Sequence, residues 1–227
     1  MDSKLVGTLF ELETRFNYIF LDKQLLVQAL THPVSNPARN YEPLEFLGDS
    51  ILAASVSFMV FEKVATSDEG LLTKFKGYLV SKDCLEKIAS GLELSKFIQL
   101  VNASGGDLIL SPRIVVDVFE ALVGAAFLDS SFESVHQILT KHFKNHFPSI
   151  TDLINYDPKS ALQELCHSKG WLNPKYTVTG TEGPEHNTTF FVTVELSDGS
   201  VFEGKGPTKK DAEKAAAALA LKSIKDS

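Results

Sequence analysis

Cysteine is scarce in this chain of 227 residues: Cys84 and Cys166 are far apart and form no Cys-x-x-Cys pattern. A disulfide framework and a zinc site are therefore unexpected, and two buried free thiols are favoured.

The sequence also lacks an apolar run long enough to cross a bilayer, and residues 1–10 lack the zones of a signal peptide. We expect no membrane contact and an intracellular location, with the cytoplasm favoured and the nucleus left open.

Positive charge is also in short supply. The chain carries 22 Lys and Arg against 29 Asp and Glu, a net charge of -7, which argues weakly against a nucleic-acid partner. The distribution is uneven, because the segment from Lys205 to Lys225 contains six lysines but only Asp211 and Glu213 as acids. This segment is a candidate phosphate-binding patch inside an acidic protein.

Hydrophobic periodicity divides the chain into two parts, with no internal repeats. Up to Phe147, apolar residues recur at spacings of three and four and strand alternation is absent, which predicts a helical part. The helices expected there cover residues 5–16, 23–31, 44–64, 71–88 and 114–128. After Phe147 the composition changes, and residues 149–156 look like a linker.

The remaining residues predict the order helix, three antiparallel strands, helix. Asp157 followed by Pro158 is a helix start, and this helix should end near Ser168. Thr208 should cap the last helix, which is rich in alanine, and Asp198-Gly199 is a hairpin signal between the last two strands. The expected strands cover residues 175–179, 188–196 and 200–204, and the last helix covers residues 209–222.

Acidic residues form a distinctive pattern near residue 45. Pro43 favours a helix that begins at this proline, which leaves Glu42 at the lip of the helix. Glu45 and Asp49 are four residues apart, so they share one helix face. Apolar residues occupy a neighbouring face of the same helix.

A second acidic pair, Asp117 and Glu120, lies in a segment that is apolar nearly all round and should therefore be buried. No Lys or Arg occurs between Arg113 and Lys141, so we expect no salt-bridge partner on that helix. Buried carboxylates are costly unless they are paired or bind metal. Four convergent carboxylates would suit Mg²⁺ or Mn²⁺, ions that serve phosphodiester hydrolysis well. Exposed acids on amphipathic helices remain the alternative.

Two runs of sequence resemble the motifs of the ribonuclease III family: LEFLGDS at residues 44–50 and DVFEALVGA at residues 117–125. The resemblance covers nearly the whole chain, and Ser111-Pro112-Arg113 is more similar to the Dicer-like branch. The family's metal-binding catalytic cluster matches Glu45, Asp49, Asp117 and Glu120, with Glu120 as the essential ligand. Further acids that line the cleavage valley, partly across a dimer interface, match Glu42 and Glu69.

The resemblance implies a multidomain α and α+β protein. An all-α endonuclease domain would cover residues 1–148, a linker residues 149–156, and an α-β-β-β-α double-stranded RNA-binding domain residues 157–227. The implied activity is Mg²⁺-dependent cleavage of double-stranded RNA for RNA processing, with Mn²⁺ as a substitute and no organic cofactor. A homodimer would cut both strands, leaving 5′-phosphate and 3′-hydroxyl ends with short 3′ overhangs. Phe46 and Phe58 are candidate dimer contacts, although single aromatics are more often core residues.

The second domain has its own candidate contacts with RNA. Ser160, Gln163, Glu164 and His167 share one face of the first helix, and His186 lies in the first hairpin loop. In the family such groups enter successive minor grooves. The first turns of the last helix favour phosphate through backbone N–H groups and the helix dipole. They contain Lys209, Lys210 and Lys214. A histidine without a role and a solvated lysine face remain open.

Three functions compete at this point. The first is the endonuclease, and the second is a non-catalytic RNA-binding scaffold of the same fold. The third is a helical dimerisation protein, which leaves the buried acids unexplained. The complete set Glu45, Asp49, Asp117 and Glu120 favours the enzyme, because degenerate relatives lose at least one of these acids. The sequence does not select among ribosomal precursors, messages and silencing duplexes as substrates.

Overall fold

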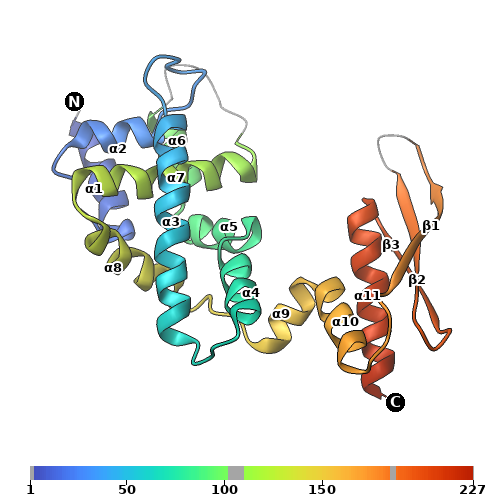
Figure 1. Cartoon of the computed structure of the whole chain (residues 1–227). Coiled ribbons are helices and arrows are strands. Elements are labelled where there is room, and N and C mark those ends of the chain that lie inside the picture. The colour runs from blue at the N-terminus through green and yellow to red at the C-terminus, as the bar shows by residue number, and fades with distance from the viewer. Residues whose placement is uncertain (1–2, 102–109, 185–187, 227) are drawn as a thin grey trace. The chain divides into compact units, whose positions relative to one another are not determined.

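A computed structural model describes residues 3–101, 110–184 and 188–226 (Figure 1). The chain forms two compact units, Met1–Pro148 and Ser149–Ser227. The described part of the first unit is helical and contains no strand, as the periodicity predicts. Its helices are α1 Ser3–Phe16, α2 Lys23–Leu30, α3 Glu42–Lys63, α4 Glu69–Leu79, α5 Lys82–Gly91, α6 Leu94–Val101, α7 Pro112–Asp129 and α8 Phe132–Phe143.

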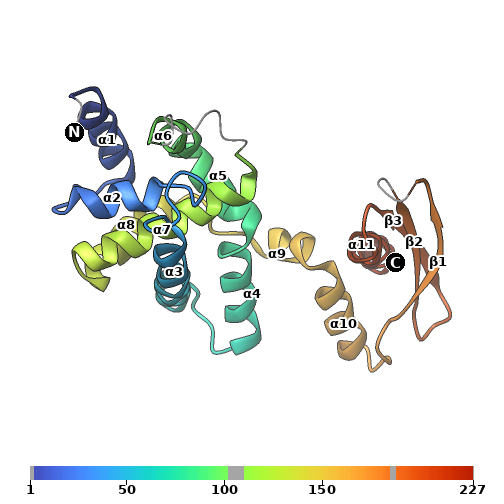
Figure 2. The same ribbon diagram turned by 90° about the horizontal axis from the view of Figure 1, so that it is seen from above.

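Helices α3 and α7 form the centre of this unit and cross each other (Figures 1 and 2). Two glycines make the close crossing possible. A Cβ atom on Gly48 would lie 1.8 Å from the Glu120 carbonyl oxygen, and one on Gly124 would lie 2.2 Å from the Leu44 carbonyl oxygen. Neither helix can accept a side chain at these points without moving away from the other.

The core of the unit surrounds this crossing. Helix α7 is buried along most of its length, as its apolar composition predicts, and α3 contributes Leu44, Leu52 and Val56 to the same core. Among the described helices, α3 alone is long and apolar enough to cross a bilayer by length and composition. The sequence alone predicts no such segment. Packing along α7 accounts for the buried apolar residues of α3 as those of a core helix, whereas Phe46, Phe58 and Phe61 on the same helix are exposed.

Several helix boundaries differ from those predicted. The predicted helix at residues 71–88 is divided into α4 and α5, because Ser81 leaves the helical conformation and its Oγ accepts a hydrogen bond from Cys84 N at 3.3 Å. Helices α6 and α8 were not predicted individually. The N-cap of α8 is Ser131, whose hydroxyl accepts from Ser134 N at 3.2 Å. Helix α3 begins at Glu42, one residue before the predicted start.

The second unit contains one sheet in the strand order β1-β2-β3, with antiparallel neighbours. Its elements are α9 Ile150–Tyr156, α10 Pro158–Ser168, β1 Lys175–Glu182, β2 Thr189–Glu195, β3 Val201–Gly206 and α11 Lys209–Asp226. Figure 2 shows α11 against one face of the sheet. Gly204 permits this contact, because a Cβ atom there would lie 2.2 Å from Ala216 N. The core between helices and sheet includes Leu162, Val194 and the buried free thiol of Cys166.

The segment 149–156 is not the irregular linker that its composition suggests. Ser149 and Asp152 form a capping box, in which Asp152 N donates to Ser149 Oγ at 3.2 Å and Ser149 N donates to Asp152 Oδ2 at 2.8 Å. The resulting helix α9 buries Leu153 and belongs to the second unit. Asp157 ends α9 and also caps α10, so this single non-helical residue separates the two helices.

Candidate active site

A cavity of about 650 Å³ lies where the N-terminal halves of α3 and α7 meet. Most of the residues that line it are acidic or polar, and they come from both helices. They are Tyr41, Glu42, Glu45, Phe46, Asp49, Ser50, Arg113, Ile114, Asp117 and Glu120. Five carboxylates therefore surround one open space, which a pair of helices with a conventional apolar contact would not produce.

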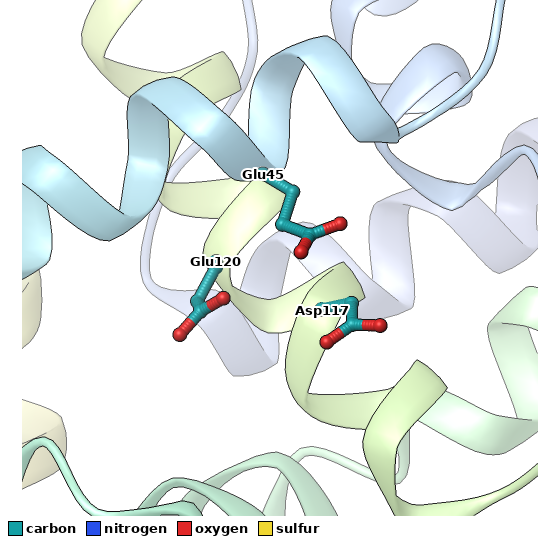
Figure 3. Close-up of side chains that lie close together, drawn as sticks. All are labelled: Glu45, Asp117 and Glu120. Carbon is teal, nitrogen blue, oxygen red and sulfur yellow. The ribbon is translucent and has the colours of Figure 1, made fainter.

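Three of these carboxylates form a compact cluster. One ligand oxygen from each of Glu45, Asp117 and Glu120 lies within 4.8 Å of the other two. Figure 3 shows Glu45 extending from α3 towards the two acids of α7. All three side chains are half-buried. The spacing and the hard oxygen donors suit a divalent cation such as Mg²⁺ or Mn²⁺.

Local structure fixes the direction of α3 into the cavity. Tyr41 N donates to Thr31 O at 3.0 Å, which ties the start of α3 to the end of α2. Asn40 is buried, and its Oδ1 accepts from Glu42 N at 3.0 Å. Pro43 lacks an N–H group, so its place in the first turn leaves no donor unsatisfied. One turn later, Gly48 brings α3 onto α7 beside Glu120.

The electrostatics of the cavity reflect crowded negative charge. Burial and then the nearby carboxylates of Asp49, Glu45 and Asp117 raise the pKa of Glu120 to about 8. Burial is also the main cause that raises the pKa values of Glu45 and Asp117. Burial and the adjacent acids raise the pKa of Tyr41 to about 12, so its phenol stays protonated and can donate a hydrogen bond. A bound divalent cation would relieve this repulsion.

The structure corrects one expectation about this cluster. Helix α7 begins at Pro112, so Arg113 belongs to its first turn and lies four residues before Asp117. Its Nε is 3.7 Å from Asp117 Oδ2, although the Arg113 side chain is 77% exposed. The helix therefore does offer one cation to the acids, through a long and solvated contact. The cap Ser111 followed by a proline was the signal that could have placed Arg113 in the helix.

The remaining predicted acids differ in position. Asp49 lines the cavity, and its charge helps to raise the pKa of Glu120. It is exposed, however, and lies outside the compact cluster of three. Glu42 is exposed and also lines the cavity, as its predicted place at the lip requires. Glu69 is the exposed first residue of α4 and is not among the described residues that line the cavity. Tyr41 lines it but was not predicted.

The candidate RNA contacts of α10 lie on one helix face, and some of them already make hydrogen bonds within the second unit. Gln163, Glu164 and His167 are exposed. Ser160 Oγ donates to Asp157 Oδ2 at 2.6 Å, so this hydroxyl already serves the cap of α10. A ring nitrogen of His167, Nε2, is 2.6 Å from Asn173 Oδ1.

The candidate phosphate contacts lie at the start of α11. Lys209 and Lys210 are exposed in its first turn, and Thr208 Oγ1 caps the helix by accepting from Asp211 N at 3.1 Å. Lys214, one turn later, is half-buried. The predicted contact His186 lies outside the described residues.

Comparisons with known proteins agree with this architecture. Residues 22–147 match the family model described as Ribonuclease-III-like, and residues 158–224 match that of the double-stranded RNA binding motif. The chain is 37% identical over 221 residues to Ribonuclease 3 of a Sulfurovum species, covering 95% of this chain and 97% of the relative. It is 35% identical over 217 residues to Ribonuclease 3 of a Nitratiruptor species, covering 95% and 96%.

A solved structure matches the first unit. It is the nuclease domain of ribonuclease III from Campylobacter jejuni, described for flexibility in a region involved in dimer formation. The match has 36% sequence identity and a TM-score of 0.54, and it covers 61% of this chain and 98% of that domain. The chain therefore belongs to the ribonuclease III family, the endoribonucleases specific for double-stranded RNA. The predicted fold class, a helical nuclease domain followed by a double-stranded RNA-binding domain, is confirmed.

Proposed function

We propose that Glu45, Asp49, Asp117 and Glu120 hold divalent metal in this enzyme and that Glu120 is the essential ligand. The compact arrangement of Glu45, Asp117 and Glu120 carries this proposal, because one ligand oxygen from each lies within 4.8 Å of the others. Asp49 lines the same cavity. It follows Glu45 by four residues and therefore shares a helix face with it. Glu42 and Glu69 are proposed supporting acids, with Glu69 acting across a dimer interface.

Mg²⁺ is the proposed ion, and Mn²⁺ is expected to substitute for it. The donors are carboxylate oxygens without any cysteine or histidine among the described residues that line the cavity, a set that suits hard cations. When bound, such an ion activates water and stabilises the leaving oxygen of a phosphodiester. The proposed ligands would hold the ion in the cavity where α3 and α7 cross, and the Tyr41 hydroxyl, which lines the same cavity, would offer a neutral hydrogen-bond donor.

The test of the metal proposal is a cleavage assay on long duplex RNA. We expect cutting with Mg²⁺ or Mn²⁺ and none with chelator. Glu120→Gln should abolish cutting while duplex binding persists, because the amide keeps the size of the side chain but not its charge. Glu62→Gln is the matched control, since Glu62 is an exposed acid of α3 that does not line the cavity. Cutting by Glu120→Gln at the wild-type rate would remove Glu120 from the ligand set.

The two units are proposed to divide the work. Residues 1–148 cut, and the unit that contains residues 157–227 holds the duplex. Ser160, Gln163, Glu164, His167 and His186 are the proposed minor-groove contacts, and Lys209, Lys210 and Lys214 the proposed phosphate contacts. Each lysine that contacts a phosphate contributes about 1 to the salt slope of binding. Replacing Lys209 and Lys210 by Ala should therefore lower this slope by about 2, and an unchanged slope would exclude them.

A homodimer is the proposed active form, with α3 as part of the contact. Phe46 is 82% exposed and Phe58 is 56% exposed, and large exposed aromatics on one helix favour a protein interface. The dimer would leave 5′-phosphate and 3′-hydroxyl ends with short 3′ overhangs, which end mapping on a long duplex tests. The expected location is the cytoplasm, where the transcripts of a bacterial cell are processed. Duplex binding without cutting under any divalent ion would instead favour the scaffold.

A further inference from the structure

Tyr156, the last residue of α9, lies against one of the candidate phosphate contacts. The Nζ of Lys214 is 5.3 Å from the centroid of the Tyr156 ring. Lys214 is half-buried, whereas Lys209 and Lys210 at the start of the same helix are exposed. The aromatic ring therefore covers part of the Lys214 side chain and restricts the positions that its ammonium group can adopt.

The ring restrains Lys214 without neutralising it. An aromatic face attracts an ammonium group and leaves its full charge available to a phosphate, whereas a carboxylate would cancel that charge. The nearby carboxylate of Glu213 is already engaged, because Lys159 Nζ lies 2.5 Å from its Oε2. Among the residues that the structure describes, Lys214 forms no ion pair.

Tyr156 is itself held in place by the second unit. The capping box at Ser149 fixes the start of α9, and Leu153 is buried. Ile154 packs against the core of the unit. Asp157 joins α9 directly to α10, because its N–H donates to Leu153 O at 3.0 Å while its side chain caps α10. The ring is therefore attached to the scaffold that carries the other RNA contacts.

We propose that Tyr156 is a positioning residue for double-stranded RNA, which holds the charged end of Lys214 ready for a backbone phosphate. The segment 149–157 then serves RNA binding rather than only joining the two units. The proposal rests on the proposed phosphate role of the α11 lysines. A lysine that is already ordered loses less conformational entropy when it meets the phosphate, so affinity increases without a new contact to RNA.

A double-mutant cycle tests this coupling. The full chain is titrated in chelator with a duplex of about 20 base pairs, longer than the roughly 16 base pairs that such a domain spans. We expect Tyr156→Leu to weaken binding about two- to fivefold, the range that corresponds to an exposed cation–π contact. Tyr156→Phe should bind like wild type, since it keeps the ring. In the Lys214→Ala background, Tyr156→Leu should have no further effect. Lys222→Ala controls for the loss of one charge from the same helix.

An equal loss on Tyr156→Leu in the presence and absence of Lys214 would overturn the proposal. A second measurement does not depend on the fold of any variant: the ε-methylene protons of Lys214 should show an upfield ring-current shift in the wild-type spectrum. Absence of that shift would also overturn it. The outcomes separate the two claims. If replacing Lys209 and Lys210 weakens duplex binding but Tyr156→Leu does not, only the role of Tyr156 is excluded. If replacing the two lysines leaves duplex binding unchanged, the proposed phosphate contacts of α11 are excluded as well.

Discussion

Replacing Glu120 with Gln should stabilise the metal-free protein at alkaline pH while abolishing cleavage. The carboxyl of Glu120 has a folded-state pKa of about 8 against an ordinary value of 4.5. The folded protein therefore holds this proton to a higher pH than the unfolded chain does. The free energy of unfolding falls as the pH rises from about 4.5 to about 8 and stays low above it. A neutral amide at this position removes that loss.

The size of the effect follows from the same values. A rise from 4.5 to about 8 corresponds to at most roughly 5 kcal/mol, at about 1.36 kcal/mol for each pH unit. The cavity is open to water, and screening reduces the repulsion, so we expect a gain of about 2 kcal/mol. For a unit of this size the melting temperature should rise by about 4–8 °C.

The assay is thermal unfolding of the nuclease unit in chelator at pH 5 and at pH 9, for the wild type, Glu120→Gln and the exposed control Glu62→Gln. The gain should be present at pH 9, small at pH 5, and absent in the control. Added Mg²⁺ should stabilise the wild type and have less effect on Glu120→Gln, because the variant lacks a ligand. Equal melting temperatures of wild type and Glu120→Gln at pH 9 would refute the claim that the ionised Glu120 side chain destabilises the folded protein.

Three further changes test the surroundings of the site. Gly48→Ala should destabilise the unit by about 3 kcal/mol and abolish cutting, because the new Cβ meets backbone that cannot move alone; denaturant unfolding and cleavage assays measure both. Arg113→Ala should tighten Mg²⁺ binding about fivefold by calorimetry, and weaker binding would show that Arg113 instead holds Asp117 in place. Asp129→Ala should cost about 2 kcal/mol in denaturant unfolding, because Asp129 accepts hydrogen bonds from the Tyr18 hydroxyl at 2.8 Å and Leu21 N at 2.7 Å.

Helical periodicity places candidate acids on shared helix faces, for a physical reason. Residues three or four apart share a helix face whatever the rest of the fold does, so Glu45 and the pair Asp117 and Glu120 could be placed from local spacing. The burial of α7 followed from its apolar composition. That the two helices meet at these faces was a hypothesis based on the cost of burying unpaired acids and on the family resemblance, because spacing within one helix carries no information about its partner.

The parts that sequence did not predict depend on boundaries and on long-range contacts. Apolar spacing continues through Ser81, so one helix was predicted where two exist. Helix α7 begins two residues before the predicted start, so Arg113 was not placed on the same helix as Asp117. Tyr41 enters the cavity only because the end of α2 fixes the start of α3. Glu69 does not line the cavity of the single chain, so its role remains a prediction about the dimer.

The glycine contact between α3 and α7 also determines when the acid cluster can assemble. Gly48 and Gly124 are distant in sequence, and the acid cluster exists only after they meet. A nascent chain that has not yet exposed residue 124 at the ribosome cannot assemble the site. Neither can a proteolytic fragment that contains only one of the two helices. Packing of α3 against α7 is thus a condition for assembly of the acid cluster, so the site forms late in synthesis of the nuclease unit.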